Sequence, residues 1–346
     1  MDALTAEDPV ELGKYRLLAR LGEGGMGRVY LAETAEGEQV AVKMIASWLL
    51  DDSGEGEFPR RFAREVDVMR SVSGPSIALY VDADVAHDPA WLATQYIPGP
   101  TLREQVLRHG PMAPEIVAMM GAHLCDGLAA LDEAGLLHRD VKPANVMLGA
   151  DGPRLIDFGL AVLAEGLDDP RAHFTTVGVS VGTQQWMPLE QQGSATVTAA
   201  ADVYSLGAVL AYAATGRTPA RTGSVSVAGL PKPLATIITE MTDGTPSARP
   251  SAAEAASRLG SVATVDGRTA TEVTADMIAA TYGQNPLPKP PPRPTTTTGK
   301  TEATEHEATG PQGTTSQETT RVRRSMSAAV FAAENLRSAY AKNRKL

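Results

Sequence analysis

Two short motifs in the middle of the chain constrain its fold more than any other feature. One begins at His138 and reads His-Arg-Asp-Val-Lys-Pro-Ala-Asn, and the other begins at Asp157 and reads Asp-Phe-Gly. Together they supply the groups that move a phosphoryl group onto a hydroxyl. We expect Asp140 to accept the hydroxyl proton and Lys142 to steady the γ-phosphate. Asn145 and Asp157 are expected to hold magnesium, which prefers oxygen ligands.

A glycine-rich segment precedes these motifs. Residues 21–29 read Leu-Gly-Glu-Gly-Gly-Met-Gly-Arg-Val, and glycines let a backbone close over phosphates without side chains in the way. Such a segment alone also fits an ordinary hairpin or a dinucleotide-binding loop. A dinucleotide fold requires a helix directly after the glycines, whereas Val29–Ala32 indicates another strand. The segment therefore favours a hairpin that covers a nucleotide.

Lys43 ends an apolar, strand-like run that begins at Val40, and it is placed to reach nucleotide phosphates. Its long, flexible side chain needs an acidic partner. Between Phe58 and Val72 apolar residues recur at intervals of three and four, which predicts a helix, and Glu65 lies beside that apolar stripe. We assign Glu65 as the partner of Lys43. The alternative is a solvated Glu65 that pairs with a neighbouring arginine.

Taken in order, these residues resemble the Hanks-type protein serine/threonine kinase family, most closely its bacterial branch. The resemblance runs from about Tyr15 to about Leu259. Lys142 matches the serine/threonine version of the catalytic loop rather than the tyrosine version. The resemblance implies ATP and Mg²⁺ as cofactors and proteins with serine or threonine acceptors as substrates.

The resemblance also implies a set of nucleotide contacts. It places Thr94 at the gatekeeper position before a hinge that receives adenine, while Val29, Ala41 and Met147 would enclose the purine. Ordinary core packing fits the same positions, because an adenine pocket is lined by core residues. The implied nucleotide-binding residues are Leu21, Gly22, Glu23, Gly24, Gly25, Met26, Gly27, Arg28, Val29, Ala41, Lys43, Thr94, Gln95, Ile97 and Met147.

The implied fold class is α+β, with the two lobes of a kinase and then a largely disordered carboxy-terminal tail. A helix is expected over Ile116–Ala134, and another that begins at Asp202. The resemblance implies that Asp202 braces the catalytic loop, and a helix amino-cap is the alternative. The expected divisions are an amino-terminal extension (1–14), a kinase domain (15–260) with lobes 15–96 and 97–260, a Thr- and Pro-rich linker (261–325) and a short basic amphipathic helix (326–346).

The segment after the Asp-Phe-Gly motif carries candidate regulatory hydroxyls. Phosphate on one of them could pair with Arg139 and order the segment through charge-assisted hydrogen bonds. We therefore predict autophosphorylation within 175–183. The candidate acceptors are Thr175, Thr176 and Ser180.

Two features depart from the family's pattern. Pro188-Leu189-Glu190 stands where the proline usually directly precedes the glutamate, although Glu190 can still pair with Arg249. The stretch 217–230 is short and lacks a clear amphipathic helix of the kind that often docks substrates. Both departures concern substrate choice rather than phosphoryl transfer.

The remaining expectations concern partners and location. Cys125 falls on the apolar pattern of a helix, so a buried, inert thiol is expected. The tail threonines could bind a phosphothreonine-reading domain, although a solvated spacer is favoured. No apolar run is long enough for a membrane helix, and a cytoplasmic location is the default. We expect no nucleic-acid partner, and a homodimer is left open.

Three function classes are compatible with these patterns. The first is an active protein serine/threonine kinase that autophosphorylates. The second is a pseudokinase-like scaffold that only binds nucleotide or a partner, and the third is a small-molecule phosphotransferase. The first is favoured because Lys43, Asp140, Asn145 and Asp157 are all present.

Overall fold

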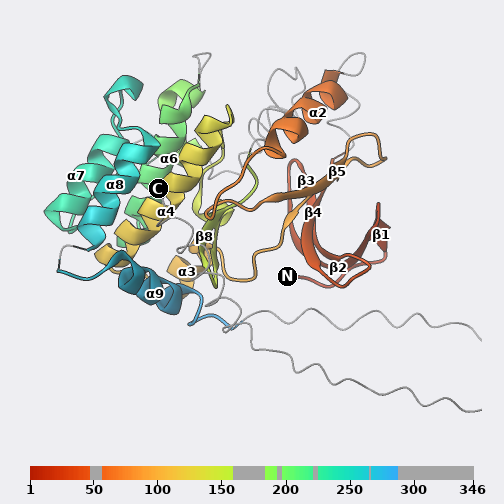
Figure 1. The fold of residues 1–346 in the computed structure, drawn as a ribbon, viewed down its shortest axis with the longest axis horizontal. Coiled ribbons are helices and arrows are strands. Elements are labelled where there is room, and N and C mark those ends of the chain that lie inside the picture. Colours follow the sequence, from red (N-terminus) through yellow and green to blue (C-terminus); the bar gives the residue numbers. More distant parts are fainter. Residues whose placement is uncertain (47–56, 159–183, 193–196, 221–224, 265, 287–346) are drawn as a thin grey trace, which may run out of the picture. The chain divides into compact units, whose positions relative to one another are not determined.

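The amino-terminal part of the chain forms a six-stranded antiparallel sheet (Figure 1). The structure, a computed structural model, describes residues 1–46, 57–158, 184–192, 197–220, 225–264 and 266–286. They lie in one compact unit, Met1–Pro291. The strand order is β1-β2-β3-β4-β6-β5. The strands are β1 (Glu11–Leu12), β2 (Tyr15–Gly24), β3 (Gly27–Glu33), β4 (Gln39–Ile45), β5 (Tyr80–Asp84) and β6 (Trp91–Gln95).

Alternation along β4 decides which side chains reach the functional face of the sheet. Val40 and Val42 are buried in a cluster that also holds Tyr15 and Trp91. Because successive side chains of a strand point to opposite faces, the side chain of Ala41 and those of every second residue after it point to the face opposite Val40 and Val42. The predicted strand before Lys43 is therefore confirmed, and so is the strand after the glycines, which is β3.

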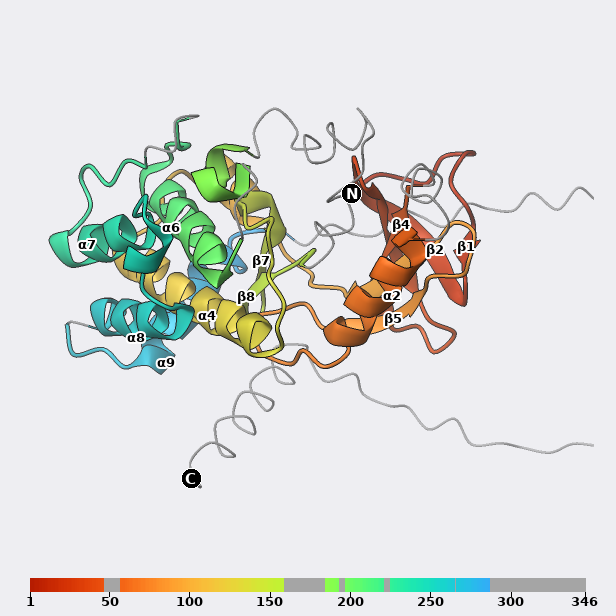
Figure 2. The same cartoon turned by 90° about the horizontal axis from the view of Figure 1, so that it is seen from above.

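The helix predicted after Lys43 is α2 (Glu57–Met69). Phe62, Val66 and Met69 are buried on one of its faces, as the three- and four-residue spacing predicts. Figures 1 and 2 show α2 lying alongside the sheet near β4 and β5.

The second part of the described chain is mainly helical (Figure 1). Its elements are α3 (Leu102–His109), α4 (Pro114–Glu133), η2 (Pro143–Asn145), β7 (Val146–Gly149), β8 (Gly152–Leu155), η4 (Gln184–Trp186), η5 (Leu189–Gln192), α6 (Ala199–Thr215), α7 (Lys232–Met241), η6 (Pro246–Ala248) and α8 (Ala252–Ala263). The described residues between 216 and 231, which leave out 221–224, contain no helix, and the predicted lack of a docking helix there stays a prediction.

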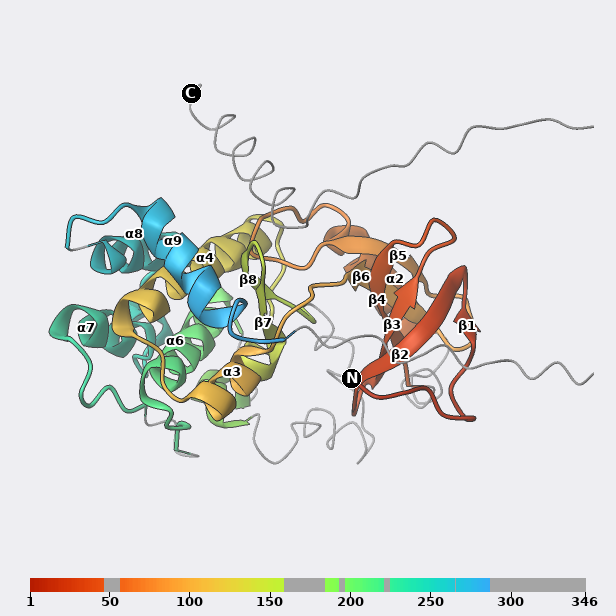
Figure 3. The same ribbon diagram turned by 90° about the horizontal axis from the view of Figure 1, so that it is seen from below.

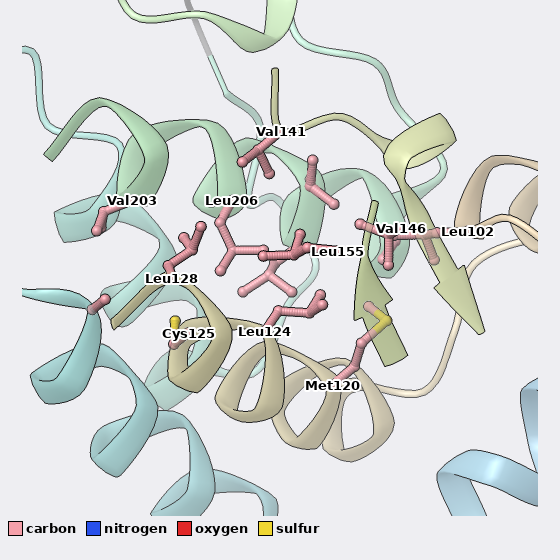
Figure 4. Packing of buried hydrophobic residues seen from close by; sticks show 14 of the residues in the cluster. Leu102, Met120, Leu124, Cys125, Leu128, Val141, Val146, Leu155, Val203 and Leu206 are labelled. Carbon is pink, nitrogen blue, oxygen red and sulfur yellow. The ribbon is translucent and has the colours of Figure 1, made fainter. Parts of the chain in front are cut away.

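Helix α4 lies at the centre of the helical core. Figure 4 shows Met120, Leu124 and Leu128 on one face of α4, directed at residues such as Leu155 on β8 and Leu206 on α6. Cys125 is also fully buried, and burial raises the pKa of its thiol, so the predicted inert role agrees with its position.

Backbone hydrogen bonds join the sheet-bearing part to the helical part behind the catalytic motifs. The Ala78 amide donates to the Leu155 carbonyl at 2.9 Å, and the Leu155 amide donates to the Ser76 carbonyl at 2.9 Å. The loop that follows α2 is thereby fixed to β8, which leads directly into Asp157.

A further helix lies where the sequence predicts a disordered linker. Helix α9 (Ala270–Thr281) begins with a capping box formed by Thr269 and Glu272, and it buries Val273 and Met277. Figure 3 shows it lying across α4 and α8. The linker prediction is wrong for residues 270–281, because a short apolar stripe in a Thr- and Ala-rich segment becomes a core face once α4 covers it. The rest of the predicted linker from 287 on, and the predicted basic helix, lie outside the described residues.

The amino-terminal extension also contributes to the fold. Strand β1 pairs with β2, and the Asp2 and Arg20 backbones exchange hydrogen bonds of 2.8 and 2.9 Å.

Within the described part of the chain, no helix is both long enough and apolar enough to span a membrane.

Candidate active site

The first catalytic motif forms a tight loop between α4 and β7, in which several groups converge on one carboxylate. Lys142 Nζ donates to Asp140 Oδ2 at 2.7 Å. The Asn145 side-chain amide donates to the same oxygen and to the Asp140 carbonyl, both at 2.9 Å. These contacts fix the Asp140 carboxylate through Oδ2.

Asp202 holds this loop from the side of α6. Its carboxylate accepts the backbone N–H of His138 at 2.7 Å and that of Arg139 at 2.8 Å. Burial raises the pKa of Asp202, while the neighbouring His138 and Arg139 act in the opposite direction. The amino-cap of α6 is Thr198, so the alternative role of Asp202 as a cap is wrong and the bracing role agrees with the contacts.

Arg139 has a φ of 62°, in the left-handed region that residues other than glycine rarely adopt. Its carbonyl accepts a hydrogen bond of 2.6 Å from the Gln191 side chain. Together with Asp202, Gln191 therefore fixes an unfavourable backbone conformation directly before Asp140.

The second motif follows β8 and brings Asp157 opposite Lys43. The Ile156 amide donates to the Asn145 carbonyl at 3.0 Å, which ties the two motifs together. Lys43 Nζ lies 3.2 Å from Asp157 Oδ2. The predicted pairing of Lys43 with Glu65 stays a prediction.

The glycine-rich segment forms the turn between β2 and β3, with Gly24 opposite Gly27. Gly27 has a φ of 135°, and a Cβ atom there would lie 1.9 Å from the Met44 carbonyl oxygen. Only glycine fits at this position. The turn therefore packs closely against β4, the strand that carries Lys43.

A cavity of about 670 Å³ lies between the glycine-rich turn and the two motifs. Arg28 and Glu65 are the predicted site residues that do not line it. The predicted residues that do line it are Leu21, Gly22, Glu23, Gly24, Gly25, Met26, Gly27, Val29, Ala41, Lys43, Thr94, Gln95, Ile97, Asp140, Lys142, Asn145, Met147 and Asp157.

The sequence profile of the family described as protein kinase domain matches residues 15–259. The chain belongs to the protein kinase family. This match agrees with the predicted limits of the resemblance and with an α+β fold of a β-rich lobe and a helical lobe. The family uses ATP, typically with Mg²⁺.

Relatives of this kinase chain are named as serine/threonine-protein kinases. It is 41% identical over 278 residues to the probable serine/threonine-protein kinase PkwA of Thermomonospora curvata, an alignment of 77% of this chain and 36% of the relative. It is 46% identical over 220 residues to AfsK of Streptomyces coelicolor, covering 63% of this chain and 26% of the relative. The chain thus matches only about a quarter to a third of the length of these relatives.

A similar fold occurs in the kinase domain of PknI from Mycobacterium tuberculosis. The TM-score is 0.58 at 23% identity, and the similarity covers 76% of this chain and 100% of that domain. This likeness concerns the fold.

The kinase cavity is also lined by residues to which the sequence assigns no individual role. Tyr96 lines it within the expected hinge, and burial raises the pKa of its phenol. Gly99 also lines it, and a Cβ atom there would lie 2.3 Å from the Leu148 carbonyl oxygen. The Pro-Gly pair after the hinge is the signal that could have identified Gly99. Gln191, whose contact to Arg139 depends on tertiary structure, carries no comparable signal.

The predicted pair between Glu190 and Arg249 is confirmed. Arg249 Nη1 lies 2.5 Å from Glu190 Oε1, and Nη2 donates to Oε2 at 3.2 Å. The Arg249 side chain is only 1% exposed and its guanidinium lies over the Tyr204 ring. The displaced proline therefore leaves this ion pair of the kinase fold intact. The predicted autophosphorylation window, 175–183, lies outside the described residues.

Proposed function

We propose that this chain is an ATP-dependent protein kinase that transfers the γ-phosphate of ATP to serine or threonine hydroxyls of proteins. The observation that carries the proposal is the arrangement around Asp140. Its Oδ2 is held by Lys142 and Asn145, and the cavity that it lines is also lined by Lys43 and Asp157. This arrangement positions a proton acceptor beside groups of both charge signs, as phosphoryl transfer requires.

The residues suit each part of the reaction. Asp140 receives the proton of the substrate hydroxyl, whose oxygen bonds to the γ-phosphorus as the bond to the bridging oxygen of ADP breaks. Lys142, within reach of the same carboxylate, is placed to offset charge on the moving phosphoryl group. Lys43 is placed to bind the phosphates that leave with ADP, and Glu65 is proposed to fix it.

The donor set also suits magnesium. Asp157 is 34% exposed, so its carboxylate is accessible from the cavity. The Asn145 amide nitrogen is used by Asp140, which leaves its amide oxygen for a cation. The described residues contain no group of three or more acidic, His or Cys side chains that could hold a metal alone, which fits an ion that takes one or two protein ligands and completes its shell with phosphate oxygens. When bound, the ion offsets charge on those oxygens.

The purine is proposed to lie between Val29, Ala41 and Met147, against the hinge at Gln95–Ile97. These residues line one cavity. Autophosphorylation within 175–183, a phosphothreonine-reading partner, a homodimer and a cytoplasmic location stay predictions from the sequence.

The decisive experiment measures transfer of labelled phosphate from ATP to a generic protein substrate and to the chain itself. Lys43→Ala and Asp140→Asn are expected to abolish transfer. Lys14→Ala and Asp132→Asn are the matched controls, because both side chains are exposed, and they should leave transfer unchanged. Equal labelling in the wild type and Asp140→Asn would contradict the proposal.

The main alternative is a pseudokinase-like scaffold. It predicts that the wild type binds a non-hydrolysable ATP analogue but transfers no phosphate to any protein. Mass spectrometry of the chain produced with and without Asp140→Asn tests the autophosphorylation prediction, and equal phosphate in residues 175–183 would contradict it.

A further inference from the structure

Asp8, which precedes the matched kinase domain, is a buried carboxylate surrounded by hydrogen-bond donors. Its side chain is 0% exposed. Arg20 Nη2 donates to both of its oxygens, at 2.7 and 2.8 Å, and the Tyr30 hydroxyl donates at 2.8 Å. The Thr5 amide and hydroxyl add hydrogen bonds of 2.8 and 2.9 Å. These hydrogen bonds fix the segment around Asp8 against β2 and β3.

The two arginines beside Asp8 extend to the glycine-rich turn. Arg20 Nη1 donates to Glu23 Oε2 at 3.1 Å, and Arg28 Nε lies 3.3 Å from Glu23 Oε1. Arg28 Nη1 lies 3.7 Å from Asp8 Oδ1. Glu23 lines the nucleotide cavity, whereas Asp8 and Arg28 do not. A chain of opposite charges therefore links Asp8 to the lip of the cavity.

The backbone follows the same route. Asp2 and Arg20 exchange two hydrogen bonds, so the first residues lie against β2 directly before the glycine-rich turn. Met1 lines the cavity together with Leu21 and Gly22. Figure 3 shows the amino terminus beside β2. The segment before β1 thus reaches the part of the sheet that is expected to cover the phosphates.

The electrostatics explain why a carboxylate is needed at position 8. Burial alone would raise the pKa of Asp8, but the hydrogen bonds from Thr5, Arg20 and Tyr30 outweigh it and lower the pKa. Asp8 is therefore charged at neutral pH. Two arginines face two carboxylates in this cluster, and removal of the Asp8 charge leaves both guanidiniums with Glu23 as their acidic partner. Arg20 is only 18% exposed, so water replaces the lost partner incompletely.

We propose that Asp8 is a positioning residue for nucleotide binding, which acts through Arg20 and Arg28 to hold Glu23 and the glycine-rich turn over the cavity. This inference rests on the proposed function, because it assigns the turn to nucleotide phosphates. It predicts that a change at Asp8 weakens nucleotide binding from outside the cavity.

The test compares the full chain and its Asp8→Asn variant, which has the same shape but no charge. Binding of the β,γ-imido analogue of ATP with MgCl₂ is measured by calorimetry, and KM and kcat are measured with ATP. We expect the dissociation constant and KM to rise about tenfold, with kcat changed less than about twofold. Asp8→Glu, which keeps the charge, should restore part of the affinity. Asp82→Asn is the matched control, because Asp82 pairs with the exposed Lys14 on the same sheet.

A double-mutant cycle separates positioning from simple loss of stability. Because Asp8 is proposed to act through Glu23, Asp8→Asn should change nucleotide affinity by less than about twofold in a Glu23→Gln background. A purely structural role predicts the same tenfold loss in both backgrounds, and that result would overturn the inference.

The remaining outcomes also decide the question. If Asp8→Asn does not fold, Arg28→Gln takes its place, since Arg28 contacts both carboxylates without lining the cavity, and the same tenfold loss is expected. If the wild type binds the analogue and these variants bind it equally well, the inference is wrong while the proposed function stands. If the wild type binds no nucleotide, the proposed function fails, and the role of Asp8 fails with it.

Discussion

Asp202 Oδ1 accepts the backbone N–H of Arg139 at 2.8 Å, across 63 positions of sequence. Its other oxygen accepts the His138 N–H, so one buried carboxylate holds the residues directly before Asp140. Because Arg139 has a positive φ, the loop would relax without such an acceptor. The loop before Asp140 is thus shaped by a residue that does not itself line the cavity.

Asp202→Asn is expected to lower phosphoryl transfer more than it lowers stability. The amide keeps the size but replaces one acceptor oxygen with an NH₂ group that faces a backbone N–H. Misplacement of the loop should lower kcat by about tenfold to a hundredfold. Burial raises the pKa of Asp202, so loss of the charge removes an unfavourable desolvation and offsets part of the lost hydrogen bond. Kinase assays and urea unfolding of the same samples test this contrast. Asp82→Asn is the control and should change neither quantity. If Asp202→Asn raised the activation free energy, calculated from kcat, by no more than it lowered the free energy of unfolding, the prediction would be wrong.

Gly27→Ala should destabilise the sheet, whereas Gly22→Ala should not. A Cβ atom at Gly27 would meet the Met44 carbonyl oxygen at 1.9 Å in a backbone with a φ of 135°. At Gly22 nothing lies within 4 Å of a Cβ atom. We expect Gly27→Ala to lower the free energy of unfolding by roughly 2 kcal/mol or more, and Gly22→Ala to change it by less than about 0.5 kcal/mol. Urea unfolding monitored by circular dichroism gives both values, and two similar values would refute the argument.

The catalytic centre could be predicted because its chemistry requires particular residues in a fixed order. Asp140, Asn145 and Asp157 are short side chains whose proposed roles, proton acceptor and magnesium ligands, require them to lie close together, so their motifs carry strong constraints on spacing. The strand before Lys43 could be predicted from its apolar β-type residues. These signals are local, and the fold only has to bring them together.

The contacts that support the centre could not be predicted, because they depend on register between distant segments. Asp8 stands in a polar segment without periodicity, and its burial follows only when β2 and β3 place Arg20 and Tyr30 beside it. Gln191 reaches Arg139 only through the tertiary fold. Val273 and Met277 form a stripe too short to stand out from a Thr- and Ala-rich composition until α4 supplies the opposing surface.

Arg249→Lys should be far more damaging than Arg268→Lys. Arg249 binds both oxygens of Glu190 in a site where the two side chains are 1% and 13% exposed, and a lysine cannot reproduce the paired geometry. Complete removal of one partner of a buried pair costs about 3 to 5 kcal/mol, and Arg249→Lys, which keeps the charge but loses the paired geometry, should cost part of that. Arg268 pairs with Asp276 at the surface, where such pairs contribute about 0 to 1 kcal/mol. Thermal unfolding of the two variants compares them directly. A similar small shift for both would show that the buried pair is dispensable.

His123 should make stability fall in mild acid. Burial lowers its pKa below the ordinary 6.5, and Asp126 acts weakly in the opposite direction. The unfolded chain therefore binds the proton more readily than the folded chain. This contribution to stability is complete above pH 6.5 and is lost as the pH falls below it. Urea unfolding at about pH 7.5 and about pH 5.5 should show a smaller acid loss in His123→Gln than in the wild type. An identical acid loss in both proteins would exclude His123 as the cause.

Helix α9 should be an integral part of the folded kinase domain, although it lies beyond the matched residues. His123 Nε2 on α4 lies 3.1 Å from Thr274 Oγ1. The buried Asn285 donates to Gln105 on α3 at 2.7 Å, and Gln105 donates to the Ala280 carbonyl at 3.2 Å. Val273 and Met277 add apolar burial, and loss of two such side chains is expected to lower the free energy of unfolding by about 3 to 6 kcal/mol.

Two truncations test this boundary. A chain that ends at Thr264 exposes the α4 surface that α9 covers. A chain that ends at Pro286 keeps α9, Asn285 and all of these contacts. The first should unfold at a markedly lower temperature and aggregate, and the second should unfold like the full chain. Asn285→Ala in the longer chain isolates the contact to α3 and should remove about 1 to 3 kcal/mol, because the Gln105 side chain loses a buried partner. Equal unfolding temperatures for the two truncations would place the domain boundary at the end of α8 and show that α9 does not stabilise the domain.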